Sequence, residues 1–177
     1  DQPVATLILA GINGALWGAV VSIMVGSGLA LLTGMELRPL LGPSMLAGLA
    51  ASVTFAALRR DDFNWRAPQS LASALVFAGV LLVASLGRPY AMTFAQAPMI
   101  WTVALLMATA GTQWVIAASQ HPIRFRAMNR FRRERAIMLS LRAFGFVFFG
   151  AMVVLPLYVM VMTSLKTQQA LLANPLN

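Results

Sequence analysis

Five long stretches of the sequence contain no charged residue, and they limit what the chain can fold into more than any other feature. They cover residues 5–33, 40–58, 69–87, 97–119 and 143–165. A helix of about 20 apolar residues crosses the hydrocarbon layer of a bilayer, which is about 30 Å thick. The sequence therefore predicts an all-α, polytopic membrane protein with about five transmembrane helices.

The composition excludes several other classes of protein. Hydrophobic residues make up 59% of the 177 residues and charged residues only 10%, which is too little polar surface to cover a water-soluble domain. The chain has no cysteine, and this excludes disulfides, thiolate metal sites and cysteine nucleophiles.

The positive charges predict the orientation of the spans. Lys and Arg total 13 against 5 Asp and Glu, and basic loops stay on the cytoplasmic side of a membrane. With the segment 120–142 in the cytoplasm, ten arginines share that side, namely Arg59, Arg60, Arg66, Arg124, Arg126, Arg130, Arg132, Arg133, Arg135 and Arg142. Only Arg38, Arg88 and Lys166 fall on the other side. We therefore expect a cytoplasmic N-terminus and an external C-terminus in a bacterial inner membrane.

This arrangement divides the chain into three parts. Residues 1–120 are expected to form a four-span module rich in glycine and alanine. Residues 121–142 are expected to form a basic cytoplasmic loop, and residues 143–177 the fifth span with an external tail.

The first span carries the clearest pattern, a small residue at every fourth position. Its members are Ala10, Gly14, Gly18, Ser22, Gly26, Ala30 and Gly34, and weaker versions are Gly48, Ser52, Ala56 and Ala104, Ala108, Thr112. Such a stripe allows two helix backbones to approach closely. The partner is either a later span of this chain or another subunit, and the helix-packing residues expected to be central are Gly14, Gly18, Ser22, Gly26 and Ala30.

The spans contain little that could support chemistry. No acidic residue, basic residue or histidine lies in the middle of a span, although ion-coupled carriers usually need one. Asn13 and Gln113 are predicted to bond to each other or to a nearby carbonyl. His121 is the sole histidine, so no ligand set for a metal is present. We expect no enzymatic activity, no catalytic residue and no cofactor.

The arginine-rich segment contains two aromatic residues, Phe125 and Phe131, among its arginines. Arg124, Arg126, Arg130, Arg132, Arg133 and Arg135 are candidates for contact with lipid or with a partner. Arginines with interspersed aromatic residues suit anionic lipid headgroups. Fixation of topology and docking of a cytoplasmic protein are the other interpretations. Nucleic acid is not expected as a partner, because the segment is too short to read a groove.

The last part of the chain resembles a known family. Residues 130–135 read Arg-Phe-Arg-Arg-Glu-Arg, an apolar segment follows, and residues 155–166 read Leu-Pro-Leu-Tyr-Val-Met-Val-Met-Thr-Ser-Leu-Lys. This pattern is similar to the start of the inner-membrane permease subunits of carbohydrate ABC importers, the maltose-permease-like family. The matching positions are Pro156, Tyr158, Met160, Thr163, Ser164, Leu165 and Lys166.

The resemblance implies a basic cytoplasmic start, a first transmembrane helix that closes with a turn at Pro156, and a cytoplasmic ATPase as a partner. It covers residues 130–175 or so, and the family's coupling loop with its Glu-Ala-Ala signature does not occur in these 177 residues. We therefore expect a membrane-integral subunit of a transport system, with a structural or assembly subunit of a respiratory or photosynthetic complex as the alternative. Other membrane subunits are expected partners in either case.

Overall fold

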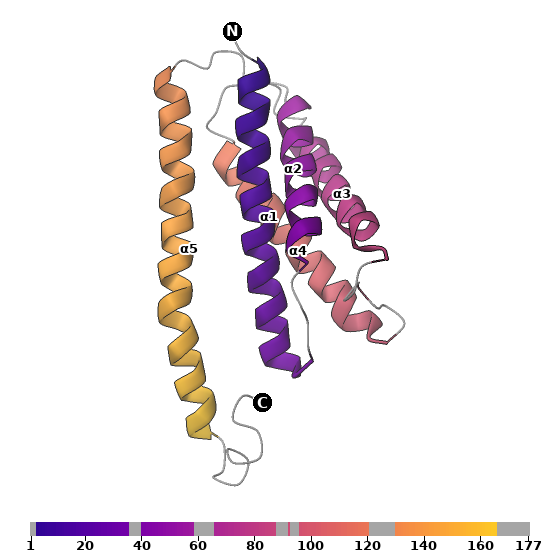
Figure 1. Ribbon diagram of the computed structural model, residues 1–177, viewed down its shortest axis with the longest axis vertical. Coiled ribbons are helices and arrows are strands. Elements are labelled where there is room, and N and C mark those ends of the chain that lie inside the picture. Colours follow the sequence, from indigo (N-terminus) through magenta and orange to yellow (C-terminus); the bar gives the residue numbers. More distant parts are fainter. Residues whose placement is uncertain are drawn as a thin grey trace. The chain divides into compact units, whose positions relative to one another are not determined.

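The computed structural model describes residues 3–35, 40–58, 66–87, 92, 96–120 and 130–165. These residues form five α-helices: α1 (Pro3–Thr33), α2 (Leu41–Ala57), α3 (Arg66–Ser85), α4 (Pro98–Gln120) and α5 (Arg130–Leu165) (Figure 1). No strand occurs in the described part of the chain. The all-helical expectation is confirmed.

Four of these helices are long and apolar enough to cross a membrane. Their apolar parts are Leu7–Thr33, Ala67–Ser85, Pro98–Gln120 and Met138–Val161. The helix α2 has only 17 residues, which gives a length of about 26 Å at 1.5 Å per residue, slightly less than the hydrocarbon layer of a bilayer. The structure thus has the character of a multi-pass membrane protein, with α2 as a short apolar helix.

Glycine or proline lies at several helix ends. Gly34 has a φ of 68°, and its N–H donates to the carbonyl of Ala30 at 2.9 Å, so α1 ends in a left-handed cap that glycine adopts without strain. Proline is the first residue of both α1 and α4, a position where its missing N–H costs nothing.

The chain divides into two compact units, residues 1–133 and 134–177, and each is described by itself. In the first unit, α1 to α4 form an antiparallel bundle. Residue pairs in contact show the direction: Gly14 lies against Gly48, Ser73 bonds to Ala51, and Gln113 bonds to Ser70. Gly14 lies against Gly48 and Gly18 against Ser44, so residue numbers increase along α1 while they decrease along α2, and Gln69 with Phe55 and Ser73 with Ala51 show the same for α3 and α2.

This up-and-down order brings particular helix ends together. The end of α2, the start of α3 and the end of α4 share one end of the bundle, because Gln69 bonds to Phe55 and Gln120 bonds to Ser52. At the opposite end, Trp101 packs with Leu29 and Ala30. We call these the Gln120 end and the Trp101 end.

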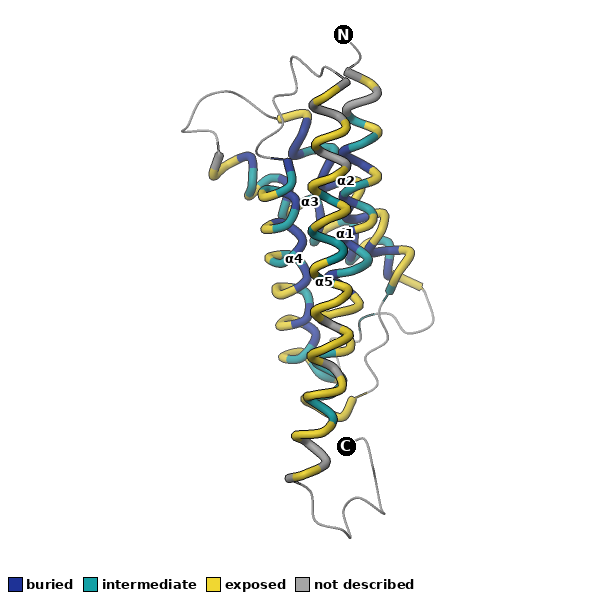
Figure 2. Tube along the Cα trace, turned by 90° about the vertical axis from the view of Figure 1, so that its left-hand side faces the viewer, coloured by how far each residue is buried: buried dark blue, intermediate teal, exposed yellow. Residues whose placement is uncertain are grey.

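The core of the bundle combines residues of α2, α3 and α4, and the buried parts of the chain are dark blue in Figure 2. Its fully buried apolar residues are Ala47, Ala51, Phe55, Phe77, Leu81, Ala108 and Ile116. Large apolar side chains also face outward, for example Leu75 at 65% and Leu106 at 62% exposure. An outer surface of large apolar side chains, with small residues where α1 and α2 meet, is the pattern of a helix bundle in lipid.

The helix α5 begins earlier than the sequence predicts. Residues 130–142 are helical, so the expected loop 121–142 is wrong over that part. The reason is local: no glycine or proline occurs between Arg130 and Phe144, and Arg, Glu, Ala, Leu and Met favour helix. The segment 121–129 lies outside the described residues.

The turn expected at Pro156 is also wrong. Pro156 lies inside α5, which continues to Leu165. Proline removes one backbone hydrogen bond, but a helix in a membrane tolerates it when neighbouring groups compensate for the loss.

Candidate functional site in the α1–α4 bundle

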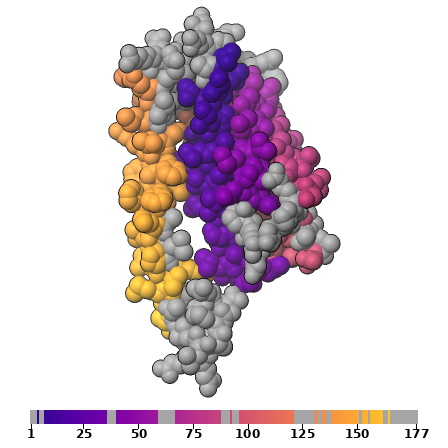
Figure 3. All heavy atoms as spheres, viewed as in Figure 1, coloured from indigo at the N-terminus to yellow at the C-terminus, as the bar shows by residue number. Residues whose placement is uncertain are grey.

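The closest backbone contact in the bundle is between α1 and α2. A Cβ atom added at Gly14 would collide with the carbonyl oxygen of Gly48 and with Ser52, and one added at Gly18 would collide with the carbonyl oxygen of Ser44. In the space-filling view the surfaces of α1 and α2 are in direct contact (Figure 3). Only glycine permits this approach, so these residues hold the two helices at backbone distance.

The other predicted packing residues of α1 also face helices of the same chain. Ser22 and Gly26 line a cavity shared with α2 and α4, and Ala30 packs against Trp101 of α4. The carbonyl of Ala10 accepts a hydrogen bond from Ser52. The stripe therefore lies against this chain's own helices in the part of the molecule that the structure describes.

The weaker small-residue patterns mark buried faces as well. All six of these residues are buried: Gly48, Ser52 and Ala56 on α2, and Ala104, Ala108 and Thr112 on α4. Small residues at four-residue spacing thus identify the interior face of three helices.

Asn13 and Gln113 do not bond to each other. The side-chain amide of Asn13 donates to Ser119 Oγ at 3.0 Å, and that of Gln113 donates to Ser70 Oγ at 3.1 Å. The antiparallel register is the reason: Asn13 on α1 lies at the level of Ser119 on α4, and Gln113 is six residues away from that level, or about 9 Å along the helix.

A layer of neutral polar side chains occupies the Gln120 end of the bundle. Gln120 donates to Ser52, Gln69 donates to the carbonyl of Phe55 at 2.5 Å, and Ser73 donates to the carbonyl of Ala51 at 2.8 Å. All of these side chains are buried. Together with the hydrogen bond from Ser52 to the carbonyl of Ala10, they join α1, α2, α3 and α4.

Sequence reasoning missed this layer. The sequence predicts Ser52 only as a small packing residue and predicts no role for Gln69, Ser73 or Gln120. The signal that could have identified them is position: Ser52 and Ser73 interrupt apolar runs on the same face as buried alanines, and Gln69 and Gln120 lie at the ends of spans.

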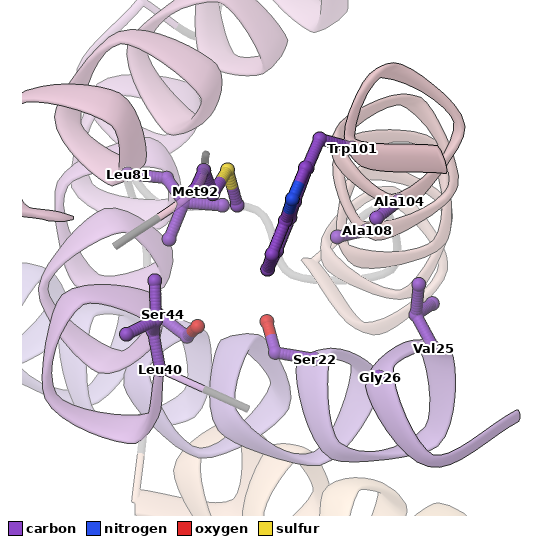
Figure 4. Close-up of a pocket in the computed structure, with 10 residues that line it drawn as sticks. All are labelled: Ser22, Val25, Gly26, Leu40, Ser44, Leu81, Met92, Trp101, Ala104 and Ala108. Carbon is purple, nitrogen blue, oxygen red and sulfur yellow. The ribbon is translucent and has the colours of Figure 1, made fainter. Parts of the chain in front are cut away.

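A cavity of about 40 Å³ lies between the helices toward the Trp101 end. It is lined by Ser22, Val25, Gly26, Leu40, Ser44, Leu81, Met92, Trp101, Ala104 and Ala108 (Figure 4). Figure 4 shows the hydroxyl groups of Ser22 and Ser44 directed into this space and the indole of Trp101 projecting into it from α4.

Several buried polar atoms near the middle of the bundle have no hydrogen-bond partner. They include Trp17 Nε1 on α1, Ser22 Oγ on α1 and Thr112 Oγ1 on α4. An unsatisfied buried polar group costs about 1–3 kcal/mol. Buried polar atoms without a partner are unusual in protein interiors, and they indicate a bound group that completes their hydrogen bonds.

The described residues that line this site carry no charge. Asp61, Asp62, His121, Arg124 and Arg126 lie outside the described residues. Arg130, Arg132 and Arg133 belong to the first turns of α5, and their side chains are not described; Arg135 is exposed on the same helix. Among the residues that the structure describes, no group of three His, Asp or Glu could hold a metal ion. The site can bind neutral groups through hydrogen bonds and apolar contact.

Comparison with known proteins gives no match: no family model, no curated protein and no solved structure is similar to this chain. The class of protein therefore rests on the helices themselves, an all-α chain with four helices able to cross a membrane.

Proposed function

We propose that the chain is a membrane-integral subunit of a transport system with no catalytic activity of its own. The observation that carries this proposal is the surface of α5. Its stretch Met138–Val161 has 24 residues and is apolar enough to cross a membrane. A helix of this kind needs lipid or other transmembrane helices around it.

The surface of α5 favours other helices as part of that environment. A Cβ atom added at Gly145 or Gly150 would meet nothing within 4 Å, so the side chains of α5 itself leave both positions uncovered. Three phenylalanines lie beside them: Phe148 stacks on Phe144 with ring centroids 6.2 Å apart and meets Phe149 edge to face at 5.8 Å. Small residues beside large aromatic ones suit close packing of helices in a membrane.

The resemblance to carbohydrate ABC importer permeases supports the kind of partner. Six of the matching positions, Pro156, Tyr158, Met160, Thr163, Ser164 and Leu165, lie in α5 as one continuous helix that begins with arginines. In this proposal α5 is the first helix of a permease-like bundle. Its partners are further membrane subunits and a cytoplasmic ATPase.

The proposed topology has five crossings in a bacterial inner membrane. It counts α2 as a span, with the N-terminus inside and the C-terminus outside. Helix directions in the first unit support this order, because the arginine-bearing connection after α2 begins at the same end of the bundle where α4 finishes. The arginines then face anionic headgroups.

The alternative function, a structural or assembly subunit of a larger complex, rests on the small-residue stripe on α1 together with the absence of titratable residues in the middle of the spans. Gly14 and Gly18 meet α2 of the same chain. That contact removes the reason to assign the stripe to a different subunit.

The test is purification of the tagged chain in mild detergent from the bacterium that encodes it. We expect an ATP-hydrolysing protein and further membrane proteins in fixed ratio, measured by mass spectrometry and ATPase activity. Gly150→Leu should release them. Gly79→Leu on α3 is the matched control, because a Cβ there also meets nothing within 4 Å, and it should retain them. Purification of the wild-type chain without any ATPase would contradict the proposal.

A further inference from the structure

The cavity at the Trp101 end of the bundle is small and has a distinct chemical character. Its volume of about 40 Å³ compares with the 10–15 Å³ or so that one water needs on this scale. About three waters fit, whereas an apolar cavity that binds benzene measures about 150 Å³. The space is therefore too small for a ring compound.

Ser22 provides the first argument that the cavity is not empty. Its side chain is 8% exposed, and its hydroxyl has no hydrogen-bond partner. A helical serine commonly bonds to a carbonyl of the preceding turn, as Ser27 of the same helix does with Ile23 at 2.5 Å. Ser22 instead directs its hydroxyl into the cavity (Figure 4).

A further polar group borders the same space. The hydroxyl of Ser44 on α2 also points into it (Figure 4), and Ser44 is 1% exposed. A buried water needs two to four polar partners, and the hydroxyls of Ser22 and Ser44 are two such groups at this cavity.

We propose that this cavity is a binding site for a cluster of about three water molecules anchored by Ser22 and Ser44. The remaining walls are apolar side chains from α1, α3 and α4 with Met92, and no charged group lines the space. Water can form hydrogen bonds with the hydroxyls of Ser22 and Ser44, and because water is neutral it needs no charged side chain in the cavity.

The test uses ¹⁹F NMR of the full chain labelled with 5-fluorotryptophan in lipid nanodiscs. The sequence has four tryptophans, and Trp101→Phe assigns the resonance of Trp101. We expect this resonance to shift between H₂O and D₂O, because water touches the indole in the cavity. We also expect that neither a water-soluble gadolinium chelate nor a doxyl-labelled lipid broadens it.

Each other outcome overturns the proposal. The absence of a solvent isotope shift means a dry cavity. Broadening by gadolinium means a cleft open to bulk water, and broadening by the doxyl lipid means that an acyl chain occupies the space.

A second measurement uses the sign of a stability change. In a hydrated cavity, Ser22→Ala removes an anchor of the cluster, so the midpoint of thermal unfolding falls and the isotope shift of Trp101 is lost. In a dry cavity the same change removes an unsatisfied hydroxyl, and the midpoint stays or rises. Ser27→Ala is the control, because Ser27 is exposed and bonds within its own helix. A midpoint for Ser22→Ala at or above that of the control overturns the proposal.

Discussion

Replacement of Gly14 by alanine tests whether the contact between α1 and α2 holds the bundle together. The added methyl group would collide with the carbonyl oxygen of Gly48 and with Ser52. Backbone atoms cannot turn aside as a side chain does, so the helices must separate. Overpacking of this kind costs about 1–3 kcal/mol.

Two further effects set the net magnitude. Separation weakens the hydrogen bonds of Ser52 with Ala10 and Gln120, each worth about 0.6 kcal/mol in a membrane protein. Alanine in place of glycine gains up to about 1 kcal/mol of helix propensity. We expect a net loss of about 2 kcal/mol in the free energy of unfolding.

The assay is unfolding by SDS in mixed micelles, followed by circular dichroism. The matched control is Gly28→Ala on the same helix, where a Cβ would meet nothing within 4 Å. This control should be as stable as the wild type or more stable. If Gly14→Ala proves as stable as Gly28→Ala, the close contact between α1 and α2 does not exist and the reasoning is refuted.

Three further predictions follow from single contacts. Ser73→Ala removes a buried hydrogen bond to the carbonyl of Ala51, and SDS unfolding should show a loss of about 0.6 kcal/mol and at most about 1.7; no loss would mean that the bond is not made. Phe146→Arg places a charge on a side chain that is 80% exposed in the middle of α5, and a glycosylation-mapping assay should show weaker insertion by about 3 kcal/mol, whereas Gly79→Ala should insert as the wild type does. Pro156→Ala restores the missing backbone N–H inside α5, so amide exchange at residues 156–160 should slow; unchanged exchange would contradict an uninterrupted helix.

The apolar parts of the helices were predictable because runs of about 20 apolar residues without a charge mark them in the sequence. The run 97–119 predicts α4 at Pro98–Gln120 to within a residue at each end. The start of α5 was not predictable in this way, because residues 130–142 contain charged side chains and therefore do not belong to an apolar run. Helix propensity determines that segment.

The interior of the bundle was predictable only in part. Spacing alone identified Gly14, Gly18 and Ser22 as packing residues, since small residues at every fourth position share one face. The partners of Asn13 and Gln113 depend on the register between α1 and α4. The register comes from three-dimensional packing, which a single sequence does not display.

The most direct test of the account asks whether α2 crosses the membrane. The chain has no cysteine, so single reporter cysteines can be introduced at Met35, after α1, and at Leu58, after α2; both residues are exposed. An impermeant maleimide added to intact spheroplasts should label Met35→Cys, and should label Leu58→Cys only after the membrane is opened. Labelling of both residues from the outside, or of neither, would show that α2 does not cross and would contradict the five-span arrangement.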